Sequence, residues 1–192
     1  MALMAVGAVA VMGMQKTSIQ GNLDARKGDV ANSIARGWID RFQRDAMAWR
    51  VSASPVPATS LTNTTFLQSA AATNGTWILA NGAQSSSGIP TSANLISGVV
   101  SPCYDILGRQ VGVDAPIGEI EFCVYARALP LTAAKDLLRL DVRVVWSRGI
   151  IPLTSGTVNA PTAVMNLGTT DPLDPTVYDA VYATTAIQES SP

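Results

Sequence analysis

The chain contains no histidine, and this absence excludes several kinds of active site. Without histidine there is no Ser-His-Asp triad, no Cys-His pair and no zinc site with imidazole ligands. Two cysteines, Cys103 and Cys123, are too few for a four-thiolate metal site within one chain. The chain has 13 lysine and arginine residues against 14 aspartate and glutamate residues, so the basic excess typical of nucleic-acid binding is missing. We expect no cofactor, no metal ion and no nucleic-acid partner.

Proline is missing from the chain up to Pro55, and polar side chains are missing from residues 1–14. The run MALMAVGAVAVMGM is shorter than the roughly 20 apolar residues that span a membrane. It lacks the basic beginning of a secretory signal peptide, and it continues without proline into a charged segment. At 192 residues, the sequence indicates one domain with an apolar appendage.

Apolar residues recur at steps of three and four between Leu23 and Trp49, which predicts one face of a helix. We expect a single helix from Ala2 to about Arg50, apolar on every side at first and on one side later. Such a helix would be about 73 Å long, whereas a compact chain of this size has a radius of gyration of roughly 16 Å. The helix must therefore protrude, with residues 1–22 as the apolar half and residues 23–192 as the globular domain.

The remainder is rich in serine, threonine, glycine and proline. Residues 52–101 favour long surface loops with one or two short strands, one of them at TWILA (76–80). Stronger strands are predicted at 119–126, 140–147 and 177–187. In 140–147, Leu140, Val142, Val144 and Trp146 alternate with Asp141, Arg143 and Ser147, which is typical of a strand with one buried and one solvated face. The prediction is an α+β fold with a loop region at 51–118 and an antiparallel sheet region at 119–192.

This order of elements resembles the type IV pilins. The helix, from MALMAVGAVAVMGMQ to the ending DAMAW at Trp49, is similar to that of minor pilins of the PilV type, and the strand RVVW ending at Trp146 is similar to their tryptophan-bearing strand. The resemblance implies a pilin fold, in which the long helix packs on a small antiparallel sheet with long loops. The family's leader, its cleavage site and the glutamate that follows are not in this sequence. We expect the sequence to begin inside the mature helix, after roughly seven further residues that complete a spanning length.

The resemblance implies a minor pilin, made as a prepilin and methylated, that supports adhesion or twitching motility and has no enzymatic activity. The implied partners are other minor pilins, the major pilin, a large tip adhesin and the inner-membrane assembly platform. The implied location is the bacterial inner membrane before assembly and then the extracellular pilus. A minor pseudopilin of a type II secretion system is one alternative. A secreted binding module or enzyme is an alternative of another class.

Four groups of residues are expected to matter. Cys103 and Cys123 are either a disulfide or two buried thiols, and the exported character favours the disulfide. Asp171, Asp174 and Asp179 suit either turns or a calcium site, and their spacing favours turns. Residues expected in the membrane or filament core are Leu3, Met4, Val6, Gly7, Val9, Val11, Met12 and Gly13. Residues expected to join the helix to the sheet, rather than to form an aromatic ligand site, are Ile34, Trp38, Phe42, Trp49, Val142, Val144 and Trp146.

Overall fold

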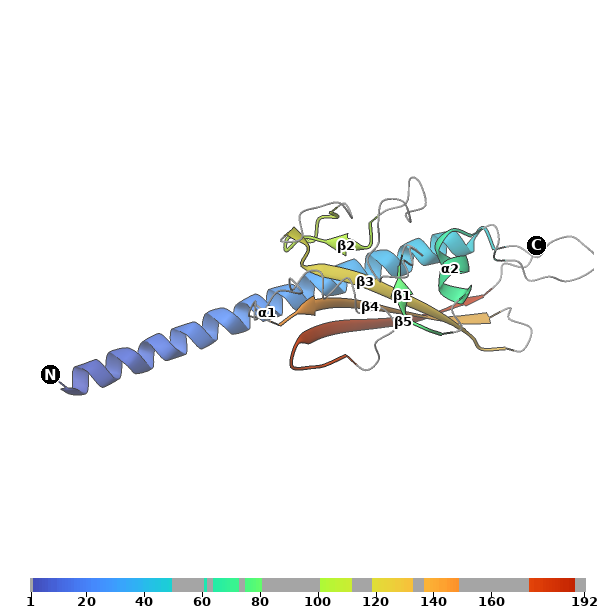
Figure 1. Cartoon of the computed structure of the whole chain (residues 1–192). Helices are drawn as coiled ribbons and strands as arrows, with labels where there is room; N and C mark the ends of the chain where they lie inside the picture. The colour runs from blue at the N-terminus through green and yellow to red at the C-terminus, as the bar shows by residue number, and fades with distance from the viewer. Residues whose placement is uncertain are drawn as a thin grey trace, which may run out of the picture.

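The computed structural model describes residues 2–49, 61, 64–72, 75–80, 101–111, 119–132, 137–148 and 173–188; the side chains of residues 2–10 and 72 are not described. The fold is α+β, with a long N-terminal helix and a small antiparallel sheet (Figure 1). The elements are α1 (Ala2–Ala46), α2 (Phe66–Ala72), β1 (Ile78–Leu79), β2 (Cys103–Tyr104), β3 (Phe122–Pro130), β4 (Leu137–Ser147) and β5 (Tyr178–Gln188).

Helix α1 is continuous over 45 residues, and its first half extends away from the rest of the molecule (Figure 1). No proline interrupts it, so its backbone hydrogen bonds run without a break. The helix ends at Ala46, slightly before the predicted end near Arg50. The cause is a tightened final turn, because the N–H groups of Met47, Ala48 and Trp49 bond to carbonyls three residues earlier.

The sheet is wholly antiparallel and has the strand order β1-β3-β4-β5. Strand β2 also pairs with β3, so two short strands share one edge of β3. The pairing of β3 with β4 places Val124 opposite Val144, and the pairing of β4 with β5 places Val142 opposite Ala183. Side chains at these positions lie on one face of the sheet, which is the face that α1 covers.

The three long strands lie where the sequence predicts strands, with shifted ends. Strand β3 begins later than residue 119 and continues past residue 126 to Pro130, while β4 begins at Leu137 rather than at residue 140. Both extensions belong to one hairpin, in which Leu129 pairs with Arg139 and Pro130 with Leu138. Backbone pairing extends these strands beyond the segments in which apolar alternation is visible.

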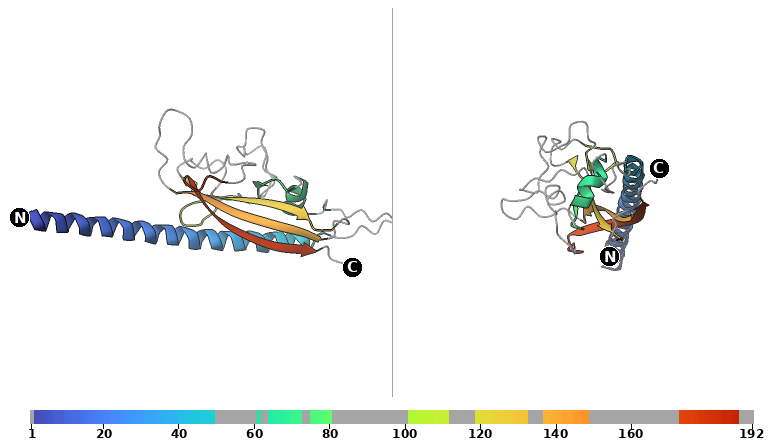
Figure 2. Two further views of the ribbon diagram at one scale, coloured as in Figure 1. Left: turned by 90° about the horizontal axis from the view of Figure 1, so that it is seen from below. Right: turned by 90° about the vertical axis from the view of Figure 1, so that its right-hand side faces the viewer.

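Both helices lie on the same face of the sheet. Helix α1 packs against β4 and β5, whereas α2 packs on β3 (Figure 2). One apolar core joins the second half of α1, helix α2 and the facing side chains of the three long strands. The residues of α1 from Val11 to Arg26 are exposed, and partial burial begins at Lys27, a few residues after the predicted domain boundary at residue 23.

Strand β1 lies within TWILA, where a short strand is predicted, whereas helix α2 corrects the prediction of loop at residues 66–72. Its N-terminal end is capped by a side chain from α1, because the Asp45 carboxylate accepts the N–H groups of Thr65, Phe66 and Leu67 at 2.8 to 2.9 Å. The Thr64 hydroxyl accepts a further N–H, from Gln68, at 3.0 Å. The other residues expected in these loops lie outside the described part of the chain, except 61, 64–65, 75–80 and 101.

Candidate functional site

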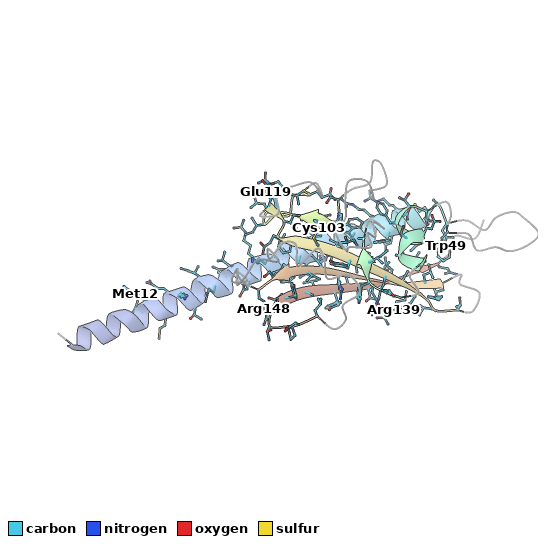
Figure 3. The ribbon with its side chains drawn as sticks, viewed as in Figure 1. Met12, Trp49, Cys103, Glu119, Arg139 and Arg148 are labelled. Carbon is cyan, nitrogen blue, oxygen red and sulfur yellow. A yellow bond between two sulfur atoms is a disulfide. The ribbon has the colours of Figure 1, made fainter. Side chains whose placement is uncertain are left out.

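The protruding half of α1 carries apolar side chains that contact nothing else in the described part of the chain. Met14 is 74% exposed, and Val11 and Met12 are also exposed (Figure 3). At Gly13 an added Cβ would meet no atom within 4 Å. The other residues expected here, Leu3, Met4, Val6, Gly7 and Val9, lie on the same helix, but their side chains are outside the described residues.

Ile19 and Leu23 continue this exposed apolar surface toward the domain. We call the segment Ala2–Met14 the apolar rod. Within the described residues, no helix is both long and apolar enough to cross a membrane. Apolar side chains exposed in this way mark a surface whose burial against another molecule would be favourable.

The second half of α1 has the opposite surroundings. The seven residues expected to join helix to sheet all lie in one buried core cluster, and Trp38 and Phe42 are fully enclosed. The indole Nε1 of Trp38 donates a hydrogen bond of 2.9 Å to the hydroxyl of Tyr104 at the end of β2. Arg41 Nη1 donates to the same hydroxyl at 3.3 Å. These aromatic side chains hold α1 on the sheet, as the sequence predicts, and the alternative interpretation of Trp38, Phe42 and Trp49 as an aromatic ligand site is wrong. The seven residues are Ile34, Trp38, Phe42, Trp49, Val142, Val144 and Trp146.

The opposite face of the sheet is not solvated as the alternation in 140–147 predicts. Asp141 and Arg143 are buried, and a second cluster of buried residues, which includes Trp77 just before β1 and Tyr125 of β3, lies on this face. The guanidinium of Arg143 lies 4.4 Å from the ring centre of Trp77 and 5.0 Å from that of Tyr125. Stacking of this kind stabilises a buried cation through the negative face of the ring. The alternation of polar and apolar residues in the strand does not predict that Arg143 is buried and stacked in this way.

We call the face of the sheet that points away from α1 the outer face. Asp141 lies at the centre of a group of hydrogen bonds on it. Its carboxylate accepts hydrogen bonds from Arg127 Nε at 3.0 Å, Arg139 Nε at 2.8 Å and Thr184 Oγ1 at 2.8 Å. Burial alone would raise the pKa of Asp141, but the hydrogen bonds from Thr184, Arg139 and Arg127 outweigh it and lower that pKa. The carboxylate therefore stays ionised and ties β3, β4 and β5 together.

The two cysteines are joined by a disulfide between β2 and β3. Cys103 and Cys123 are direct register partners and are fully buried on the outer face of the sheet. The bond closes a loop of 20 residues, which restricts the unfolded chain. It also fixes β2, and with β2 the turn that follows it, to the edge of the sheet.

The predicted aspartate cluster is divided between separate local roles. Asp174 forms a turn, because its carboxylate accepts the N–H and the hydroxyl of Thr176 at 2.9 and 2.7 Å. Asp179 pairs with Arg148 at 2.7 Å across the start of β5. Asp171 lies outside the described residues.

A shallow groove of about 140 Å³ lies where α1 leaves the domain. It is lined by Leu23, Arg26 and Lys27 of α1 and by Ile106 and Leu107 of the turn after β2. No feature of the sequence pointed to this groove, since it depends on how the turn docks beside the helix.

The chain matches no family model, no curated protein and no solved structure.

Proposed function

We propose that this chain is a structural subunit of a type IV pilus, specifically a minor pilin with a pilin fold. One observation carries the proposal: in a single helix, α1, the sequence is apolar up to Met14 and the described side chains from Val11 to Arg26 are exposed, whereas the second half is buried against a small antiparallel sheet. Such a rod loses its exposed apolar area only by entering lipid or by packing against other helices. The role we propose is therefore physical, in holding and assembling subunits, and not enzymatic.

The mechanism follows from the two surroundings available to the rod. Before assembly, the rod holds the subunit in the bacterial inner membrane, with the sheet domain outside. During assembly, the rod moves from lipid into a bundle of similar helices, so that its apolar side chains stay away from water throughout the transfer. The partners we propose are other minor pilins, the major pilin, a large tip adhesin and the inner-membrane assembly platform.

Two features of the domain support export. The Cys103–Cys123 disulfide is of the kind that persists in oxidising compartments. The hydrogen bonds to Asp141 join the three long strands and so stabilise the domain itself. The place that we propose for this domain is the pilus tip complex, where it would prime assembly and support adhesion or twitching motility.

Mass spectrometry of the native N-terminus tests the proposal. We would analyse protein from filaments sheared off intact cells and, separately, protein from the membrane fraction. A peptide that extends upstream of Met1 and begins with a methylated aromatic residue, found in the sheared material, is the expected result. A protein that is soluble, absent from filaments and begins within or after the apolar rod would contradict the proposal.

A deletion strain distinguishes the pilus from the related secretion system. We expect fewer surface filaments and reduced twitching in the strain, with secretion of proteins across the outer membrane unchanged. Intact pili with lost secretion would instead assign the chain to the pseudopilus of a type II secretion system.

A further inference from the structure

Positive charge is concentrated on the outer face of the sheet. The four charged side chains of β3 and β4 are Arg127, Arg139, Asp141 and Arg143, and all four lie on this face. Three positive charges against one negative charge give these two strands a net charge of +2, whereas the whole chain has a net charge of −1. Charge placed unevenly in this way attracts a negatively charged ligand to one face of the domain.

Tyr182 of β5 presents an aromatic ring beside these charges. It is 56% exposed, and its ring meets that of the buried Trp77 in a T-shaped arrangement, with 6.1 Å between the ring centres. Trp77 is itself held by the guanidinium groups of Arg127 and Arg143, which each lie 4.4 Å from its ring centre. Because Tyr182 rests on a fixed base, little side-chain entropy is lost when a ligand stacks on it.

Arg139 offers a preformed site for a carboxylate. Its side chain is 48% exposed, and its Nε donates a hydrogen bond of 2.8 Å to Asp141 Oδ1. Within the described part of the chain this is the one hydrogen bond that Arg139 makes, so its two terminal nitrogens have no protein partner there. The exposed Thr184 donates to the same oxygen at 2.8 Å. A guanidinium held at one nitrogen keeps its orientation and binds a carboxylate through two parallel N–H groups.

The strand register places the ring and the guanidinium at a spacing that suits a sugar. On β5, Tyr182 lies opposite Arg143 and Thr184 lies opposite Asp141. Positions two residues apart on one face of a strand are separated by about 7 Å. Since Asp141 holds Arg139, the guanidinium lies near the Thr184 position, one such step from Tyr182. A pyranose ring stacked on Tyr182 can therefore direct a carboxylate substituent to Arg139.

We propose that the outer face of the sheet binds an acidic saccharide, which is a sugar that carries a carboxylate. The sugar ring stacks on Tyr182, the terminal nitrogens of Arg139 bind the carboxylate, and the hydroxyl of Thr184 accepts a hydrogen bond from a sugar hydroxyl. A nucleic acid fits this face less well, because its backbone needs a row of cations, whereas the described charges form one compact cluster. The inference goes beyond the proposed function and does not depend on it, since it needs only the folded domain.

Matched pairs of sugars test the proposal on the full-length chain in detergent micelles. The probes are the methyl glycosides of glucuronic acid and N-acetylneuraminic acid. Each is compared with the same glycoside in which the carboxylate is reduced to an alcohol, and saturation-transfer NMR titrations give the dissociation constants. We expect at least one acidic sugar to bind about tenfold more tightly than its reduced counterpart. Equal dissociation constants within both pairs, or no binding by either acidic sugar, would overturn the proposal.

Two variants separate the roles of the charge and the ring. Arg139→Gln should weaken binding of the acidic sugar about tenfold and leave binding of its reduced counterpart unchanged. Tyr182→Leu should weaken binding of both sugars about fivefold, because both stack on the ring. The matched control is Arg36→Gln, since Arg36 is exposed on α1, which covers the other face of the sheet. Circular dichroism checks that each variant is folded.

The remaining outcomes point to other ligands. Equal loss of affinity in Arg36→Gln and Arg139→Gln would overturn the proposal, because it would show attraction to the charge of the whole chain. Tighter binding of a single-stranded DNA oligonucleotide than of either acidic sugar, with loss of that binding in Arg139→Gln, would also overturn it in favour of a nucleic-acid surface. Failure of the sugar site leaves the pilin function standing, and absence of the chain from filaments leaves the sugar site standing.

Discussion

The two halves of α1 share one continuous backbone and differ in the surroundings of their side chains. Around Trp38, one face of the helix is buried against the sheet and α2, whereas around Met12 the side chains meet only solvent in the described structure. Helix formation is cooperative, so a half that is fixed by tertiary packing supports the extension of the half that is not. The domain and the rod are therefore coupled through the backbone but not through the packing of the described side chains.

The largest effect is expected where the docked half meets the sheet. Replacing Trp38 by alanine should lower the free energy of unfolding by about 3 to 5 kcal/mol, because it empties a large buried volume and removes the hydrogen bond to Tyr104. Replacing Met12 by alanine should change it by less than about 0.5 kcal/mol. Urea unfolding followed by far-ultraviolet circular dichroism measures both. Similar losses from the two substitutions would show that the halves are packed alike.

A smaller effect is expected at the point where α1 ends. Replacing Asp45 by alanine removes the acceptor for three N–H groups at the start of α2 and should cost about 1 kcal/mol. Asp40 lies on the exposed face of the same helix, and Asp40→Ala is the matched control, with an expected change below about 0.5 kcal/mol. Hydrogen exchange of the α2 amides provides the measurement. An unchanged exchange rate in Asp45→Ala would contradict the capping role.

Acid should destabilise the domain and leave the rod unchanged. Because the pKa of Asp141 is lowered in the folded state, its contribution to stability is complete above its unfolded pKa of about 3.9 and is lost as the pH falls through the folded value. Thr184→Val removes one hydrogen bond that lowers this pKa, so the variant should lose less stability between pH 7 and pH 3 than the wild type. Urea unfolding at the two pH values gives the difference, and parallel pH profiles would contradict it.

The smallest effect is expected from removing the rod itself. A chain that lacks residues 1–14 should remain folded and soluble, with a free energy of unfolding within about 0.5 kcal/mol of the full chain. The described side chains of this segment pack against nothing in the domain. Thermal unfolding in the same buffer compares the two chains. Unfolding of the shortened chain would show that the segment belongs to the core.

The features predicted well from the sequence are those that repeat over many residues. Helix α1 and the three long strands extend through enough turns or alternations for a period to be visible, so the burial of Trp38, Phe42 and Val144 follows from spacing alone. Helix α2 spans only seven residues and takes its cap from Asp45, which lies 20 residues before Thr65 in the sequence. A local pattern carries no information about such a partner.

The burial of the outer face of the sheet and the formation of the groove were not predicted, for a related reason. Asp141 and Arg143 alternate with apolar residues as solvated side chains do, and only the rings of Trp77 and Tyr125 reveal that this face is covered. Trp77, which precedes β1, and Tyr125 of β3 are far from Arg143 in the sequence and come close to it through strand pairing. The groove likewise requires the turn at Ile106 to lie beside Leu23, which is a tertiary arrangement.

The direction of α1 relative to the sheet has a mechanical consequence. The long strands run along the helix rather than across it (Figure 2). A pull on the N-terminal end of α1 therefore loads the contact with β4 and β5 in shear, so that the packed turns share the force instead of separating one after another. Trp38 and Trp49 are both buried in the core that joins this helix segment to the sheet, so both would have to slide past the sheet together. The domain should therefore resist a force along α1 better than a force that lifts the helix off the sheet.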